Sequence, residues 1–170
     1  DLSGKILANS RVRCLFENTP GYFVRFHEIV MNFFRENGIA EEGDARLLGV
    51  GISLPGTIDP VSGLLRQSLT LGVQEMNLQR LIQRLHYPVC FGHNAKNAAL
   101  AECSGGAENM AYISLSDTVG GGAFLNGKCY TGDRFKAVLF GHMIIVPHGK
   151  KCYCGKRGCL NAYCSARSLC

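Results

Sequence analysis

The alternation of apolar and polar residues predicts that helices and strands follow one another along the chain. Apolar side chains recur at helical spacing over residues 22–37, and Gly38 follows as a helix stop. A nearly unbroken apolar run at 46–53 predicts a buried strand, which ends in a turn at Pro55-Gly56. Alternating elements of this kind favour an α/β fold.

The rest of the chain continues this pattern. A run of three glycines leads into a strand and a hairpin turn at Asn126-Gly127. A shift in composition near Asn109 predicts two lobes, 1–108 and 109–170. The remaining predicted elements are helices at 77–86 and 95–103, strands at 88–91, 110–115 and 143–146, a helical start near Asn161, and strand-like residues at 1–15 after a polar turn.

Composition narrows the class of protein. The chain has 170 residues, of which 46% are hydrophobic, and its apolar runs are too short to span a bilayer. We therefore expect no membrane association, and the lack of a signal-peptide pattern favours a cytoplasmic protein. The formal charge of +5 is spread along the chain, which favours a solvated surface over a nucleic-acid-binding patch. A start at Asp1 without Met suggests a piece of a longer chain.

The nine cysteines are the unusual feature of the composition. An odd number cannot all pair within one chain, and they are crowded at the C-terminal end. A secreted disulfide scaffold is usually shorter and evenly cross-linked. This distribution favours a reduced protein with a metal site.

The crowded segment has the spacing of a metal site. Two thiols one residue apart, a third thiol beyond a glycine-containing turn and an upstream imidazole can form a tetrahedral Cys3His zinc site. Four protein ligands leave no position for a catalytic water, so the ion would be structural. The predicted ligands are His142, Cys152, Cys154 and Cys159, with Gly155 and Gly158 permitting the turn.

Two alternatives to this ligand set remain. His148 is a rival to His142 as the imidazole ligand. The cysteines can also be free thiols beside a core histidine. Cys164 and Cys170 fall outside the pattern, and we expect them to be buried thiols.

Several segments together resemble the ROK family of repressors and sugar kinases. The resemblance runs in order from about Asp1 to Ser165 and implies an actin-like ATPase (ribonuclease H-like) fold with two α/β lobes, incomplete in this chain. It also implies a sugar in the cleft. The matching segments are GVGISLPGTID at 49–59, NAALAE at 97–102, GGG at 120–122, NGK at 126–128, and Gly141-His142 with CYCGKRGC at 152–159.

The position of the catalytic base departs from the family pattern. In the family motif N-D-A-N, an Asp accepts the proton of the sugar hydroxyl that attacks the γ-phosphate. The corresponding residues here are His93-Asn94-Ala95-Lys96, which puts Asn94 at the base position. An amide cannot accept that proton at neutral pH. His93 is the alternative base, because an imidazole titrates in the right range.

The phosphate loop and the sugar contacts also depart from the family. The family's G-T-G-x-G-G-G reads S-D-T-V-G-G-G here, so Asp117 lies beside an expected anion and only Gly120, Gly121 and Gly122 remain. We therefore do not expect ATP binding. Leu139 and Asn161 replace two glutamates of the sugar site. The resemblance assigns ligand contacts to Gly56, His93, Asn94, Leu139, His142 and Asn161.

These departures favour a non-catalytic module over an enzyme. We expect the effector-binding and oligomerising part of a ROK transcription regulator, with a sugar or sugar derivative as ligand. DNA would be bound only through an upstream domain that this chain lacks. The alternative is an ATP-dependent kinase of a hexose or amino sugar. A third possibility, a zinc module that itself binds nucleic acid, rests on Lys150, Lys151, Lys156 and Arg157 around the cysteines.

Overall fold

The chain divides into two compact units in the computed structural model, which describes residues 1–83, 85–103 and 106–169. Unit 1 comprises Asp1–Ile52 and Asn77–Cys90, and unit 2 comprises Ser53–Met76 and Phe91–Cys170. The lobe boundary expected between residues 108 and 109 stays a prediction. No helix in the described part of the chain is long and apolar enough to cross a bilayer. Cys170, expected to be a buried thiol, lies outside the described residues.

Unit 1 is built around the helix α1 (Pro20–Glu36), which confirms the helix predicted at 22–37. Thr19 caps its first turn, because its hydroxyl oxygen accepts a hydrogen bond from the backbone N–H of Tyr22 at 3.3 Å. Met31 and Phe34 are buried on the inner face of the helix. They share the core of unit 1 with the short 3-10 helix η1 (Leu78–Leu81), whose two leucines are also buried.

The helix predicted at 77–86 is wrong in length, since η1 is the one helical element among the described residues of that range. The Asn77 side chain accepts a hydrogen bond from the backbone N–H of Gln79 at 2.8 Å and starts the turn. Leu78 and Leu81 are three residues apart, so a single 3-10 turn already buries both.

The strands predicted at 46–53 and 88–91 are confirmed as β1 (Val50–Leu54) and β5 (Val89–His93), which pair in a two-stranded sheet. The polar turn at the start of the chain is also present, with a hydrogen bond from Gly4 N–H to the Asp1 carbonyl at 3.0 Å. The strand-like expectation for residues 1–15 is wrong, because no strand forms in that segment.

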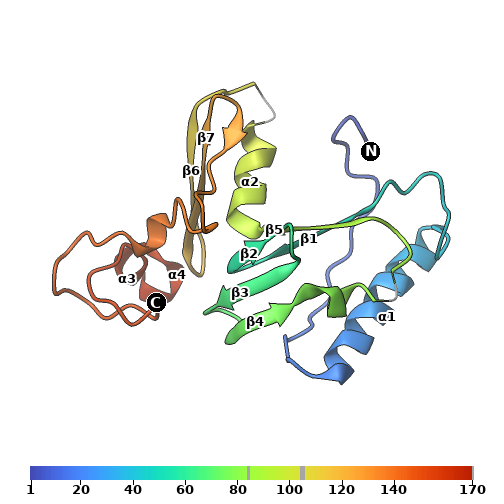
Figure 1. Cartoon of the computed structure of the whole chain (residues 1–170), viewed down its shortest axis with the longest axis horizontal. Helices are drawn as coiled ribbons and strands as arrows, with labels where there is room; N and C mark the ends of the chain where they lie inside the picture. The colour runs from blue at the N-terminus through green and yellow to red at the C-terminus, as the bar shows by residue number, and fades with distance from the viewer. Residues whose placement is uncertain (84, 104–105, 170) are drawn as a thin grey trace. The chain divides into compact units, whose positions relative to one another are not determined.

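Unit 2 begins with an antiparallel meander that the sequence analysis did not predict. Its strands are β2 (Thr57–Asp59), β3 (Leu64–Ser68) and β4 (Val73–Asn77), in that order in the sheet (Figure 1). Asp59 shapes the first turn by accepting hydrogen bonds from Val61 and Ser62 and by pairing with Arg66 at 2.9 Å. The Ser68 hydroxyl oxygen accepts a hydrogen bond from the backbone N–H of Leu71 and shapes the second turn.

The centre of unit 2 is a second antiparallel sheet covered on one face by a helix. Figure 1 shows α2 (Asn94–Cys103) lying along the sheet that comprises β6 (Met110–Leu115), β7 (Val119–Leu125) and β8 (Lys128–Cys129). Phe124 and Ala99 are almost fully buried at 1% and 0% exposure. The predicted helix at 95–103, the strand at 110–115 and the hairpin at Asn126-Gly127 are confirmed.

The helices in the described part of the C-terminal segment are short: η2 (Phe140–His142), α3 (Asn161–Cys164) and α4 (Ala166–Leu169). The helical start at Asn161 is confirmed, and the strand predicted at 143–146 is wrong. Its apolar side chains are exposed, and the N–H groups of Ile145 and Val146 both donate to one carbonyl oxygen, that of Gly158. An isolated antiparallel bridge joins Ile144 to Cys159, and the pairing does not extend into a strand.

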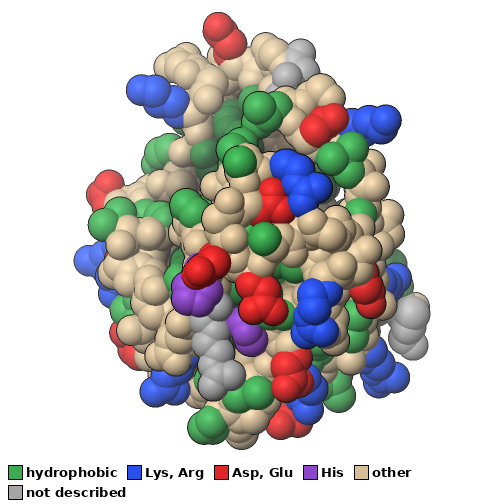
Figure 2. Space-filling view, turned by 90° about the vertical axis from the view of Figure 1, so that its right-hand side faces the viewer, with side chains coloured by type: hydrophobic (Ala, Val, Ile, Leu, Met, Phe, Trp, Pro, Cys, Tyr) green, Lys and Arg blue, Asp and Glu red, His purple; other side chains and the backbone are tan. Residues whose placement is uncertain are grey.

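Charged side chains are mixed in sign over the surface shown in Figure 2. Lysine and arginine alternate there with aspartate, glutamate and apolar groups, without a continuous basic patch. Charges of both signs are therefore interspersed on this face.

Candidate functional site

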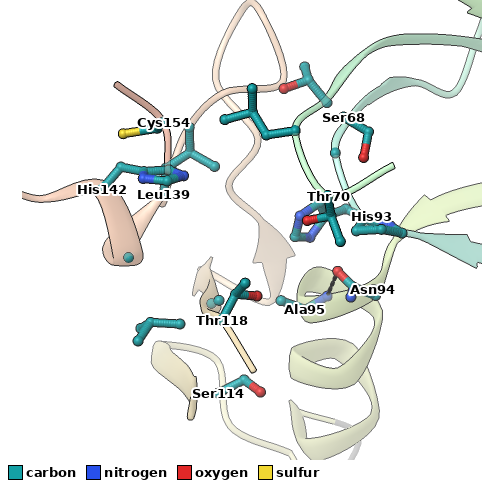
Figure 3. Close-up of a pocket in the computed structure, with 18 of the residues that line it drawn as sticks. Ser68, Thr70, His93, Asn94, Ala95, Ser114, Thr118, Leu139, His142 and Cys154 are labelled. Carbon is teal, nitrogen blue, oxygen red and sulfur yellow. Dashed lines mark hydrogen bonds between the residues drawn. The ribbon is translucent and has the colours of Figure 1, made fainter. Parts of the chain in front are cut away.

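A cavity of about 630 Å³ lies within unit 2, and five parts of the unit line it. They are the turn before β2, the end of β3, the junction of β5 and α2, the turn between β6 and β7, and the segment that holds η2 and the cysteine loop 152–159. Figure 3 shows Leu139, His142 and Cys154 on one side of the cavity, with Ser68, Thr70 and His93 on the other. The volume suits a small ligand.

Asn94 opens α2 at the wall of this cavity, at the predicted base position. Its side-chain oxygen accepts a hydrogen bond from the backbone N–H of Ala95 at 2.8 Å (Figure 3). An amide in this position can orient a hydroxyl group, but it cannot take up the proton.

His93 also lines the cavity, next to Asn94. Burial, followed by the positive charge of Lys96, lowers the pKa of His93 to about 4. Its Nδ1 atom is buried and has no hydrogen-bond partner in the described part of the chain. The imidazole is therefore neutral near pH 7 and a poor proton acceptor.

The three glycines of the expected phosphate loop lie inside the strand β7. A Cβ atom at Gly120 would lie 2.8 Å from Ala95 Cβ, and one at Gly122 would lie 2.7 Å from Ala99 Cβ. These glycines thus let α2 pack closely against the sheet. Gly120 and Gly121 line the cavity, whereas Gly122 does not, and Asp117 is exposed on the β6–β7 turn outside it.

The two positions that replace the family's sugar-site glutamates have different surroundings. Leu139 lines the cavity and is 41% exposed, so it presents an apolar group to any ligand. Asn161 is 2% exposed and does not line the cavity. Its amide oxygen accepts from the backbone N–H of Val119 at 2.8 Å, and its nitrogen donates to the carbonyl of the same residue.

Gly56 lines the cavity where the chain turns sharply between β1 and β2. Its φ of +130° is a conformation that residues with a side chain rarely adopt. A Cβ atom there would lie 2.5 Å from the carbonyl oxygen of Gln67, so the meander closes around this residue.

The four predicted metal ligands come together beside the cavity. The ligand atoms of His142, Cys152, Cys154 and Cys159 all lie within 4.8 Å of one another. The distance is 3.8 Å between Cys154 Sγ and Cys159 Sγ, and also between Cys152 Sγ and His142 Nδ1. A tetrahedral zinc ion with Zn–S bonds of about 2.3 Å separates two sulfur ligands by about 3.8 Å. The donor set and its spacing therefore fit a zinc ion.

The surroundings of the cluster also suit a cation. Burial raises the pKa of the Cys159 thiol to about 12, so ionisation of this thiol needs a neighbouring positive charge. Burial, with Lys156, lowers the pKa of His142, which favours the neutral imidazole that binds metals. With Nδ1 turned to Cys152, the Nε2 atom lies 3.4 Å from the Tyr153 hydroxyl.

Residues within and next to the loop 152–159 determine its conformation. Gly155 and Gly158 have φ angles of +89° and +81°, as expected from the sequence. Backbone hydrogen bonds from Cys152 N–H to Lys156 O and from Gly158 N–H to Lys150 O, at 2.8 and 2.9 Å, close the turn. His148, the rival ligand, is not part of the cluster. Cys164 is half-buried, also outside it.

Several residues that line the cavity were not predicted from the sequence. They are Ser68, Thr70, Ser114, Ser116, Thr118, Tyr153, Lys96, Lys136 and Lys156. Lys96 was within reach of that analysis, because it occupies the last position of the family's N-D-A-N motif. The others come from loops and strand ends whose side-chain directions a sequence pattern does not specify.

The chain belongs to the ROK family, whose model matches residues 1–170. Both kinases and repressors are among its relatives. It is 34% identical to a glucokinase of Halalkalibacterium halodurans, over 98% of this chain and 57% of the relative. It is 33% identical to the DNA-binding transcriptional repressor Mlc of Escherichia coli, over 99% of this chain and 42% of the relative. The chain thus spans about half the length of these proteins.

Solved structures show the same fold. A ROK family glucokinase from Streptomyces griseus, in complex with glucose and AMPPNP, superimposes with a TM-score of 0.83 at 28% identity, covering 99% of this chain and 53% of its own. A ROK transcriptional regulator homologous to E. coli MLC gives 0.71 at 26% identity, covering 86% and 38%. The predicted α/β class and actin-like ATPase fold are confirmed.

Proposed function

We propose that this chain is the effector-binding part of a ROK transcription regulator, and that it binds a sugar or sugar derivative without phosphorylating it. The observation that carries this proposal is Asn94, an amide at the wall of the cavity where a ROK kinase needs a carboxylate. Its oxygen is also engaged by the backbone N–H of Ala95. His93 is no substitute, because its pKa of about 4 leaves it a weak base.

The lining of the cavity supports binding without phosphoryl transfer. Leu139 offers no hydrogen bond to a sugar hydroxyl, and Asn161 is occupied by Val119. An unpaired polar group of a hexose beside Leu139 would cost about 1–3 kcal/mol. The glycines at 120–122 are explained by packing against α2, so they give no separate indication of a phosphate site.

We propose that His142, Cys152, Cys154 and Cys159 bind one structural zinc ion. The spacing of their ligand atoms supports this assignment, and the four ligands leave no open position for chemistry. Because His142, Cys154, Tyr153 and Lys156 also line the cavity, the ion would hold one wall of the effector site in place.

In the whole protein, a segment outside this chain would bind DNA. Binding of an effector would shift the populations of two conformations of that protein. We further expect the whole protein to be a cytoplasmic homo-oligomer. Sedimentation of the full-length protein with and without sugar tests the oligomeric state.

The second candidate is an ATP-dependent sugar kinase. The resemblance to glucokinases, with a TM-score of 0.83 for one of them, is the observation that favours it. This reading requires a proton acceptor other than Asn94.

A coupled assay of ADP release separates the two candidates. The full-length protein is incubated with ATP and glucose, N-acetylglucosamine or N-acetylmannosamine, beside an active ROK glucokinase as positive control. We expect no turnover above the background of ATP hydrolysis. Sugar-dependent turnover that disappears in Asn94→Ala would overturn the proposal and establish the kinase.

A further inference from the structure

Within the described part of the chain, the lysine, arginine, aspartate and glutamate residues that line the cavity in unit 2 are all lysines. Three lysines line it, Lys96, Lys136 and Lys156, and no aspartate or glutamate is among its lining residues. Asp117, on the β6–β7 turn, is exposed and lies outside the lining. A pocket for a neutral sugar needs hydrogen-bond acceptors for hydroxyl protons, and carboxylates are the strongest of these. This cavity instead offers cationic donors.

Lys96 has the clearest need of an anionic partner. It is half-buried on α2, and burial lowers the pKa of its ammonium group. Within the described part of the chain, the one hydrogen bond of that group goes to the carbonyl oxygen of Phe135, at 3.3 Å. A neutral carbonyl does not compensate a buried charge, so an anion beside Lys96 would be stabilised.

The neighbours of Lys96 suit the same ligand. The ammonium group of Lys96 reaches the carbonyl oxygen of Phe135, which directly precedes Lys136, and both lysines line the cavity. Lys156 lines the cavity from the cysteine loop 152–159. Thr70, Ser114 and Thr118 line the other walls, and their hydroxyls suit the hydroxyl groups of a sugar (Figure 3).

We propose that the effector is an anionic monosaccharide, whose phosphate or carboxylate group binds at Lys96 and Lys136 while its hydroxyls contact the serine and threonine side chains. This inference rests on the proposed function and names the class of its ligand. In this cavity the charged groups that select the ligand would be lysines, which favour an anion, and not carboxylates, which accept hydrogen bonds from the hydroxyls of a neutral sugar. The cavity of about 630 Å³ is large enough for a monosaccharide with one charged substituent.

Calorimetric titration of the full-length, zinc-loaded protein tests this assignment with matched ligands. The pairs are glucose with glucose 6-phosphate, N-acetylglucosamine with its 6-phosphate, and glucose with glucuronate. Inorganic phosphate and ATP are separate arms. We expect at least one anionic sugar to bind about tenfold or more tightly than its neutral partner and than inorganic phosphate. The phosphate and carboxylate arms identify the charged group.

Two variants and one control locate the binding group. Lys96→Gln and Lys136→Gln should each weaken the anionic sugar about tenfold or more, and by more than they weaken its neutral partner. Lys128→Gln, on the exposed strand β8 outside the cavity, should leave both unchanged. Since Lys136 is exposed, its variant keeps the test valid if Lys96→Gln does not fold.

The remaining outcomes distinguish a failure of this inference from a failure of the proposed function. If neutral sugars bind as tightly as the anionic ones or more tightly, or if no sugar binds, the proposal of an anionic ligand is wrong. A response to Lys96→Gln and Lys136→Gln no larger than that to Lys128→Gln would overturn it too. Sugar-dependent ATP turnover would overturn the regulator, and affinity for the anionic sugar would then be judged independently from the same titrations.

Discussion

The side-chain amide of Asn161 forms hydrogen bonds with both the N–H and the carbonyl group of Val119. Its amide oxygen accepts from the Val119 N–H at 2.8 Å and its amide nitrogen donates to the Val119 carbonyl at 3.4 Å. Asn161 opens α3, and Val119 opens the glycine strand β7. The residue that the family resemblance placed in the sugar site therefore joins α3 to the central sheet.

Asn161→Ala should destabilise the protein by about 1–3 kcal/mol, because a buried N–H group of Val119 loses its partner. Urea unfolding of the full-length protein measures this. Asn109→Ala is the matched control, since Asn109 makes one exposed hydrogen bond to the Asn126 N–H. A loss that is equal in both variants would contradict the role assigned to Asn161.

Removal of a predicted zinc ligand should remove the metal. We expect about one zinc ion per chain by elemental analysis of the wild-type protein, and substantially less than one in Cys154→Ser, together with a lower melting temperature. Cys164→Ser, outside the cluster, should keep its zinc. A metal-free wild-type protein, with unchanged stability in Cys154→Ser, would remove the site.

Gly122→Ala should destabilise the packing of α2 on β7. The added Cβ atom would lie 2.7 Å from Ala99 Cβ, so the helix has to shift, at a cost of about 1–3 kcal/mol. The double variant with Ala99→Gly should recover part of that loss, which a double-mutant cycle measures. Gly21→Ala is the control, because a Cβ there meets nothing within 4 Å. Additive effects of the two central substitutions would contradict the contact.

Stability should fall as the pH drops from about 6.5 to about 4. The pKa of His93 is about 4 in the folded chain, below the ordinary value of 6.5, because burial penalises the charged imidazole. Between these two values the unfolded chain binds the proton first, so acid favours unfolding, by at most about 3 kcal/mol. His93→Gln should flatten this part of the pH profile, measured by urea unfolding at several pH values.

The control for this profile is His148→Gln, at an exposed loop position. Its pH profile should follow that of the wild-type protein. If His93→Gln retains the full decline in stability between pH 6.5 and 4, the burial of His93 is not its cause.

Local patterns in the sequence determined much of the fold. The helical spacing of apolar residues and the cap at Thr19 specify α1, and the same kind of short-range information specifies α2 and β6. The meander β2–β3–β4 was missed, because its strands are only three to five residues long and their register depends on side chains such as Asp59 and Ser68 that close the turns. The apolar run at 143–146 was misread, because periodicity cannot tell a strand from a segment held by a neighbouring loop.

The sequence alone also identified the four side chains of the His/Cys cluster, since spacing within a short loop limits where the thiols can lie. Only the tertiary structure decided what surrounds them. It placed Asn161 against Val119 rather than in the cavity, made the glycines of β7 a packing surface for α2, and gathered three lysines around one cavity without a carboxylate. These arrangements join residues distant in the chain, and long-range packing, which has no local signature, sets them.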